Sequence, residues 1–139
     1  MNTLLGVSWG CWFAAAFGSA LGGVLRYAAQ LLSGRPAVTG WPWGTFLVNL
    51  LGCLAIGLVA GWWFGRGQPP LGRALLMVGV LGGFTTYSSF ALEVVMWWQQ
   101  GAALRALCYV AATTLACVLA AAAGLWLWQN LLSNGGVGR

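Results

Sequence analysis

The sequence contains no histidine, no lysine and a single acidic residue, Glu93. Only 5% of its 139 residues are charged, whereas a soluble domain usually carries about 25% charged residues. So few charges cannot solvate the surface of a globule. A disordered chain is excluded as well, because it needs low hydrophobicity and high net charge, and 60% of the residues here are hydrophobic. The composition therefore predicts an integral protein of the lipid bilayer.

The same absences restrict the chemistry of the chain. General acid–base catalysis draws mainly on histidine, lysine and paired carboxylates, and most structural metal sites need clusters of histidine, cysteine and acidic residues. The four cysteines form no CxxC pair. The six arginines give a net charge of +5, but they are scattered rather than gathered in the basic stripe of a nucleic-acid-binding protein. We therefore expect neither an enzyme nor a partner of nucleic acids.

Four apolar segments have the length of about 20 residues that a membrane-spanning helix needs. They are 8–32, 44–64, 71–98 and 104–132, and the breaks between them are polar and rich in turn-forming residues. Tryptophans gather at the segment ends, as expected for side chains at the membrane–water interface. Trp43 and Trp62, for example, are separated by about 28 Å of helix. The sequence predicts an all-α protein with one domain, residues 1–139, built from four transmembrane helices.

The arginines are divided equally between the two sides of such a bundle. One side would carry Arg66, Arg73 and Arg139, and the other Arg26, Arg35 and Arg105. Because the positive-inside rule needs an excess on one side, this balance predicts insertion in both orientations and an antiparallel homodimer. A topology signal outside this charge count is the alternative. Small residues four apart, such as Gly18 and Gly22, allow close helix packing within a chain or between chains.

The third segment contains a polar centre that makes a poor helix. Glycines at 79, 82 and 83 are followed by hydroxyl side chains at 85, 86, 88 and 89. Backbone groups freed at membrane depth must line a cavity or an ion site, and unwound carbonyls can ligate a small cation. We therefore predict a break in the third helix at mid-membrane. An intact helix packed through its glycines is the alternative.

Polar residues also mark the second and fourth segments. Asn49 lies in the middle of the second, where it could form a site or simply a hydrogen bond between helices. Tyr109, Thr113 and Cys117 follow each other at four-residue spacing and share one helix face. A line of hydrogen-bond donors without a fixed cation suits a small, strongly hydrated anion, because conduction needs weak binding at successive sites.

These residues resemble the Fluc/CrcB family of fluoride ion channels over essentially the whole chain. The motifs that carry the resemblance are GGVLRY at 22–27, GTFLVN at 44–49 and GGFTTYSSF at 82–90 with Glu93. The resemblance implies a passive fluoride channel of a bacterial inner membrane that lowers cytoplasmic fluoride. It also implies an antiparallel dual-topology homodimer with two pores, and a structural sodium ion, Na⁺, at its centre. The backbone carbonyls of Gly82 and Thr85 would hold this ion.

The resemblance further implies which side chains meet fluoride. They are Asn49, Tyr87, Ser88, Ser89, Phe90, Glu93, Tyr109, Thr113 and Cys117, with Arg26 in the vestibule. Aromatic rings have a positive edge that can face an anion without carrying a charge. The sequence departs from the family pattern at Tyr87, where phenylalanine is usual, and at Cys117, where a hydroxyl is common.

Two other functions remain open. A proton-coupled small multidrug exporter also has four spans and one membrane-embedded glutamate, and such a residue is functional by default. In those exporters, however, the glutamate lies in the first span, whereas Glu93 lies in the third. The second alternative is a membrane scaffold that transports nothing.

Overall fold

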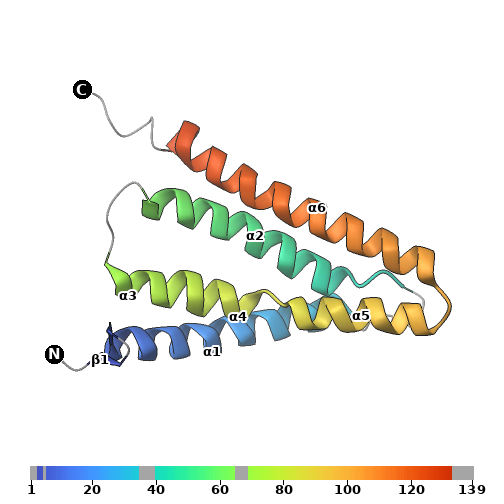
Figure 1. The fold of residues 1–139 in the computed structure, drawn as a ribbon, viewed down its shortest axis with the longest axis horizontal. Coiled ribbons are helices and arrows are strands. Elements are labelled where there is room, and N and C mark those ends of the chain that lie inside the picture. The colour runs from blue at the N-terminus through green and yellow to red at the C-terminus, as the bar shows by residue number, and fades with distance from the viewer. Residues whose placement is uncertain (1–2, 5, 35–39, 65–68, 133–139) are drawn as a thin grey trace.

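The computed structural model describes residues 3–4, 6–34, 40–64 and 69–132. The described chain is helical apart from a short antiparallel hairpin of β1 (Thr3–Leu4) and β2 (Val7–Ser8) (Figure 1). The helices are α1 (Trp9–Leu32), α2 (Trp43–Phe64), α3 (Pro70–Arg73), η1 (Ala74–Leu81), α4 (Gly82–Phe84), α5 (Tyr87–Gln99), α6 (Ala103–Leu127) and η2 (Trp128–Leu132). The prediction of an all-α protein is confirmed. Arg35, Arg66 and Arg139, on which the charge balance depends, lie outside the described residues.

Three helical rods in the described part of the chain are long and apolar enough to cross a membrane. They are Trp43–Phe64, Pro70–Gln99 and Ala103–Asn130. Helix α1 is not among them, because its glycines and tryptophans, together with Arg26 and Gln30, lower its mean hydropathy. All four predicted segments nevertheless coincide with helical rods to within one residue at each end.

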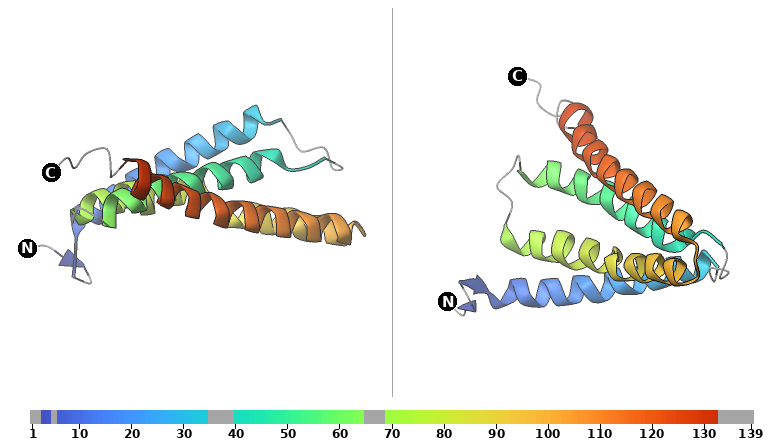
Figure 2. Two further views of the ribbon diagram at one scale, coloured as in Figure 1. Left: turned by 90° about the horizontal axis from the view of Figure 1, so that it is seen from above. Right: turned by 45° about the vertical axis from the view of Figure 1, so that its right-hand side comes forward.

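The helices are arranged in two close pairs. Helix α1 lies along η1 and α4, and α2 lies along α6; these two pairings have the most extensive contacts in the molecule. Helices α2 and α6 run in the same direction, and α5 packs beside the first half of α6 (Figures 1 and 2). Each turn of α2 therefore lies beside one turn of α6, and this pairing of turns continues along both helices.

Glycines allow both pairs to pack backbone against backbone. A Cβ atom at Gly22 of α1 would overlap the carbonyl oxygen of Val80, and one at Gly57 of α2 would overlap that of Ala121 on α6. Close approach of this kind is the usual role of small residues between membrane helices. At these positions the four-residue spacing of glycines thus serves packing within one chain.

The third rod is interrupted between α4 and α5. Thr85 and Thr86 have extended backbone, with φ/ψ of −79°/156° and −147°/110°. The Thr86 hydroxyl accepts a hydrogen bond of 3.2 Å from the Ser89 N–H, so Thr86 is the N-cap of α5, a position that threonine favours. The rod before the interruption is π-helical over η1, and the Gly82 N–H donates to the Met77 carbonyl, five residues back.

Candidate functional site

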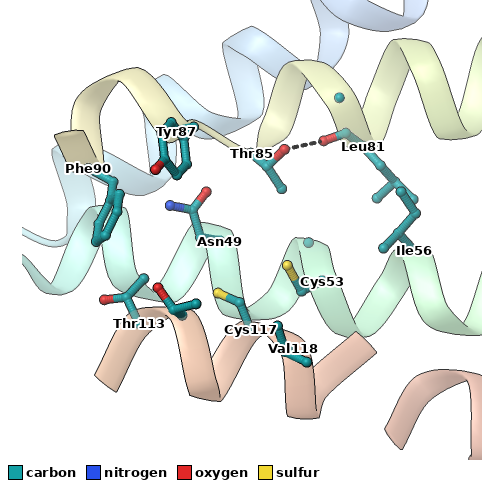
Figure 3. Close-up of a pocket in the computed structure, with 13 residues that line it drawn as sticks. Asn49, Cys53, Ile56, Leu81, Thr85, Tyr87, Phe90, Thr113, Cys117 and Val118 are labelled. Atoms are coloured by element: carbon teal, nitrogen blue, oxygen red, sulfur yellow. Dashed lines mark hydrogen bonds between the residues drawn. The ribbon is translucent and has the colours of Figure 1, made fainter. Parts of the chain in front are cut away.

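A cavity of about 330 Å³ lies where the interruption faces α2 and α6 (Figure 3). Seven of the residues singled out from the sequence line it: Asn49, Gly82, Thr85, Tyr87, Phe90, Thr113 and Cys117. They come from four different elements and from the extended backbone between α4 and α5. The cavity thus brings together residues that lie far apart in the sequence.

Polar residues of α2 and α6 face each other at three successive levels. Thr45, Asn49 and Cys53 lie four residues apart on α2, and Tyr109, Thr113 and Cys117 have the same spacing on α6. We call these six residues the polar ladder. The three pairs stay aligned because α2 and α6 run in the same direction and their backbones are in close contact at Gly57 and Ala121.

Glu93 of α5 accepts hydrogen bonds from both residues of the first level of the polar ladder, Thr45 and Tyr109. Its Oε1 accepts a 2.6 Å hydrogen bond from the Thr45 hydroxyl, and its Oε2 accepts a 2.8 Å bond from the Tyr109 hydroxyl. Hydrogen bonds to an ionised acceptor are roughly twice as strong as neutral ones. Glu93 does not line the cavity beside the interruption. It lies instead at a second cavity of about 450 Å³, between the end of α1 and the start of α2.

Three aromatic rings are in contact beside the first cavity. The ring centroid of Phe90, a buried residue, lies 5.4 Å from that of Tyr87 and 5.1 Å from that of Tyr109. Tyr87 is 80% exposed although it lines the cavity, whereas Tyr109 is fully buried. Tyr87 and Phe90, two of the residues that the resemblance places at the fluoride path, are therefore in contact, with Phe90 buried in the chain and Tyr87 on its surface.

Asn49, on the second level, holds the interruption in place. Its Nδ2 donates to the Thr86 carbonyl at 3.0 Å, and its Oδ1 accepts from the Thr86 N–H at 2.7 Å. In a continuous α-helix this N–H would bond the carbonyl of Gly82. Here the Thr86 N–H donates to the Asn49 side chain instead, so the Gly82 carbonyl has no α-helical partner.

Two hydrogen-bonding groups on this level remain uncommitted. The amide nitrogen of Asn49 has a second N–H beyond the one given to Thr86. The buried hydroxyl of Thr113 has no partner of hydrogen-bonding geometry within the described part of the chain, although the Tyr109 hydroxyl lies near it on the same helix face. Buried polar groups usually have a partner, so both groups are available to a small ligand in the cavity.

Three of the predicted site residues lie elsewhere. Ser88 and Ser89 have their hydroxyls 3.2 Å and 3.1 Å from the Thr86 hydroxyl, beside the cap of α5, and line neither cavity. Arg26, on α1, also lines neither of the two cavities. A hydroxyl in a motif can thus serve a helix end rather than a ligand.

Sequence reasoning missed three residues of the site. Thr45 and Cys53 belong to the polar ladder, and Thr86 connects Asn49 with α5. The signal for the first two was present, since each lies four residues from Asn49 and shares its helix face. Within the described residues no three histidine, cysteine or acidic side chains cluster as metal ligands.

The fold and the cavity define the class first: an all-helical membrane protein with a largely apolar cavity that holds a few hydrogen-bonding groups and no basic side chain. The family follows from comparison with known proteins. The sequence model of the family described as CrcB-like protein, Camphor Resistance (CrcB), matches residues 13–125. The chain belongs to this family.

Curated relatives extend the match over most of the chain. A protein of Rhodospirillum centenum is 47% identical over 121 residues, which cover 86% of this chain and 96% of the relative. One of Hyphomonas neptunium is 42% identical over 120 residues, covering 85% and 94%. One of Paracoccus denitrificans is 42% identical over 118 residues, with the same coverage. Each of these proteins is named Fluoride-specific ion channel FluC.

Proposed function

We propose that this chain is a fluoride-selective ion channel through which fluoride leaves the cytoplasm passively, down its electrochemical gradient. The observation that carries the proposal is the pair of uncommitted donors, on Asn49 and Thr113, in a cavity of a chain whose relatives are named fluoride-specific channels. It follows that the chain is a transporter rather than an enzyme. Its cargo is fluoride, and it has no role with nucleic acids.

The chemistry of the cavity suits a small anion in transit. Fluoride is strongly hydrated, so it needs hydrogen bonds in exchange for those of water, but a fixed cation would trap it. The donors of Asn49 and Thr113 and the positive ring edges of Phe90 and Tyr87 would offer such weak contacts. Glu93, Tyr109 and Cys117 extend this path along the polar ladder, with Ser88 and Ser89 beside it. Arg26 would raise the anion concentration at a mouth.

A passive path is sufficient for the biological task. Hydrogen fluoride is neutral and crosses membranes, and in a less acidic cytoplasm it ionises and is trapped. The membrane potential then favours the outward movement of the anion by about 2.3 kcal/mol per 100 mV. Such a channel would confer fluoride resistance without an energy source, and its setting would be a bacterial inner membrane, as its relatives are bacterial proteins.

The architecture is proposed to be an antiparallel dual-topology homodimer of four-span subunits, with α1 as the first span and the interruption of the third at mid-membrane. The exposure of Tyr87 supports the dimer. Its ring lines the cavity yet is 80% exposed, so one chain alone leaves the path open at its side. A second copy against this side would enclose it.

A structural sodium ion, Na⁺, at the dimer centre is part of the same proposal. Carbonyl oxygens are suitable ligands for a hard cation, and unwound segments of membrane helices supply them. The carbonyl of Gly82 has lost its α-helical partner, and Thr85 has extended backbone. These two residues, from both copies, would hold the ion, which would fix the interruptions of the two chains against each other.

The test is fluoride efflux from liposomes that contain the purified protein, followed with a fluoride electrode beside a chloride electrode. We expect fast loss of fluoride, no loss of chloride and no change when a protonophore abolishes the proton gradient. Replacing sodium by a large organic cation should slow the efflux. Fluoride retention by liposomes with folded protein would contradict the channel, and efflux that needs a proton gradient would favour the exporter.

A further inference from the structure

Two of the four free cysteines lie in the cavity beside the interruption. Cys53 and Cys117 both line it, whereas Cys11 is buried in α1 and Cys108 is exposed near the start of α6. Neither thiol has a part in the fluoride path that requires sulfur. Their place in the cavity is therefore a property of this chain that the proposed function leaves unexplained.

Cys53 and Cys117 form the third level of the polar ladder. Their side chains point from α2 and α6 into the same cavity (Figure 3). One turn further on, a Cβ atom at Gly57 would overlap the backbone of Ala121. The two backbones are therefore in close contact one turn from the cysteines, which holds the two thiols on facing helices at the same level.

We propose that Cys53 and Cys117 form a two-thiolate site for a soft, thiophilic metal ion, of which Hg²⁺ is the best match. The thiolate is the form of cysteine that binds metals, and soft metals select sulfur ligands. On binding, each thiol releases its proton to water and each sulfur donates an electron pair to the metal. Nothing is oxidised or reduced.

Charge and ligand number select the metal. Two thiolates neutralise Hg²⁺ completely, so the complex places no net charge at membrane depth, where an uncompensated charge is costly. Ag⁺ or Cu⁺ would leave one negative charge. Structural Zn²⁺ needs four ligands, and no cluster of three metal-binding side chains exists in the part of the chain that the structure describes.

The site has a consequence for transport that rests on the proposed function. Cys117 lies one helical turn from Thr113 in the same cavity. A metal ion held between the two sulfurs would occupy the last level of the polar ladder. We therefore expect Hg²⁺ to block fluoride efflux, and a small dithiol that removes the metal to restore it.

Binding is tested on the purified full chain, loaded with Hg²⁺, washed with an excess of a small monothiol and analysed for metal per chain. Wild type should retain one Hg²⁺, and so should Cys108→Ala, a matched control outside the cavity. Cys53→Ala and Cys117→Ala should bind about 100-fold more weakly, because a single sulfur loses the advantage of the linked pair. Equal retention by wild type and these two variants, or none by wild type, would overturn the site.

A measurement on wild type alone covers the case in which a variant does not fold. Bound Hg²⁺ should protect Cys53 and Cys117 from a maleimide while Cys108 still reacts, as read by peptide mass. Reaction at all these positions would contradict the proposal. The liposome assay separates the two proposals. If the protein binds Hg²⁺ but shows no fluoride efflux even without the metal, the channel is refuted and the metal site is not. Normal efflux with Hg²⁺ bound would refute the block.

Discussion

Asn49 and Thr86 form a reciprocal pair of hydrogen bonds across the two halves of the chain. The Asn49 amide donates to the Thr86 carbonyl and accepts from the Thr86 N–H, at 3.0 Å and 2.7 Å. A side chain of α2 thus replaces the backbone partner that the Thr86 N–H would have had in a continuous helix. The pairing leaves one Asn49 N–H for the cavity, so Asn49 both supports the interruption and presents a donor.

Replacing Asn49 by alanine should therefore impair stability and transport together. Asn49→Ala leaves the buried N–H of Thr86 without its partner, at a cost of about 1–3 kcal/mol, and removes one of the hydrogen bonds to the Thr86 carbonyl. We expect a lower midpoint of thermal unfolding in detergent and a fluoride efflux reduced by about ten-fold or more. Asn130→Ala is the control, since Asn130 is an exposed residue that does not line the cavity, and its amide donates to the Trp126 carbonyl one turn back. Wild-type stability of Asn49→Ala would contradict the role assigned to the pair.

Two substitutions of Tyr109 should separate its hydroxyl from its ring. Tyr109→Phe removes the donor to Glu93 but keeps the ring contacts with Trp41 and Phe90, both at 5.1 Å between centroids. Its expected cost in unfolding free energy is about 0.5–3 kcal/mol, the range that covers hydrogen bonds to neutral and to charged groups. Tyr109→Leu should cost about 1 kcal/mol more, because the aromatic contacts are lost as well.

Chemical unfolding in mixed micelles measures both variants. Thr45→Val is the companion to Tyr109→Phe, since Thr45 donates to the other oxygen of the same carboxylate at 2.6 Å. The two variants should be destabilised to a similar degree. A Tyr109→Phe protein as stable as wild type would show that the ring alone matters at this position.

Substitutions of Phe90 and Tyr87, whose rings are in contact at the cavity, should have different effects on fluoride efflux. Phe90→Ile keeps an apolar side chain in the buried position but removes the ring edge, so fluoride efflux should fall by about ten-fold or more. Tyr87→Phe keeps the edge and removes only an exposed hydroxyl, and it should conduct at least as fast as wild type. The fluoride electrode distinguishes the two. If the Phe90→Ile protein showed wild-type efflux, the aromatic rings would not be part of the fluoride path.

Adjacent glycines in α1 offer a matched test of helix packing. In Gly22→Ala the new methyl group would meet the Val80 carbonyl and the Phe84 nitrogen, the latter at 2.8 Å, and overpacking typically costs about 1–3 kcal/mol. In Gly23→Ala the nearest atom is the Arg26 Nη2 at 4.0 Å. That variant should be as stable as wild type or more stable, by about 0.5–1 kcal/mol, because glycine is unfavourable within a helix.

Thermal unfolding and the yield of folded protein after gel filtration compare these two variants. We expect Gly22→Ala to melt at a lower temperature and to give less folded protein. If Gly22→Ala and Gly23→Ala behaved alike, the close contact between α1 and η1 would not be needed for stability.

Much of the fold follows from the sequence alone, because its determinants are local. Apolar length predicts membrane helices, and glycine, proline and polar runs mark where they end, so the limits of the helical rods were predicted to within one residue. The run of glycines and hydroxyls likewise marked the region of Thr85 and Thr86, where the backbone leaves the helix. The homodimer, its two orientations and the sodium ion stay predictions.

The roles of the polar residues were decided by the tertiary structure. Nothing local distinguishes Ser88 and Ser89, which lie beside the Thr86 cap, from Thr113, whose hydroxyl lies unpartnered at the cavity. The partners of Asn49 and Glu93 depend on which turn of one helix meets which turn of another. That register is set by backbone contacts such as the one between Gly57 and Ala121. The spacing of polar residues in the sequence shows which face of each helix is polar. Which residue of one polar face lies opposite which residue of the next is decided only by how the helices pack.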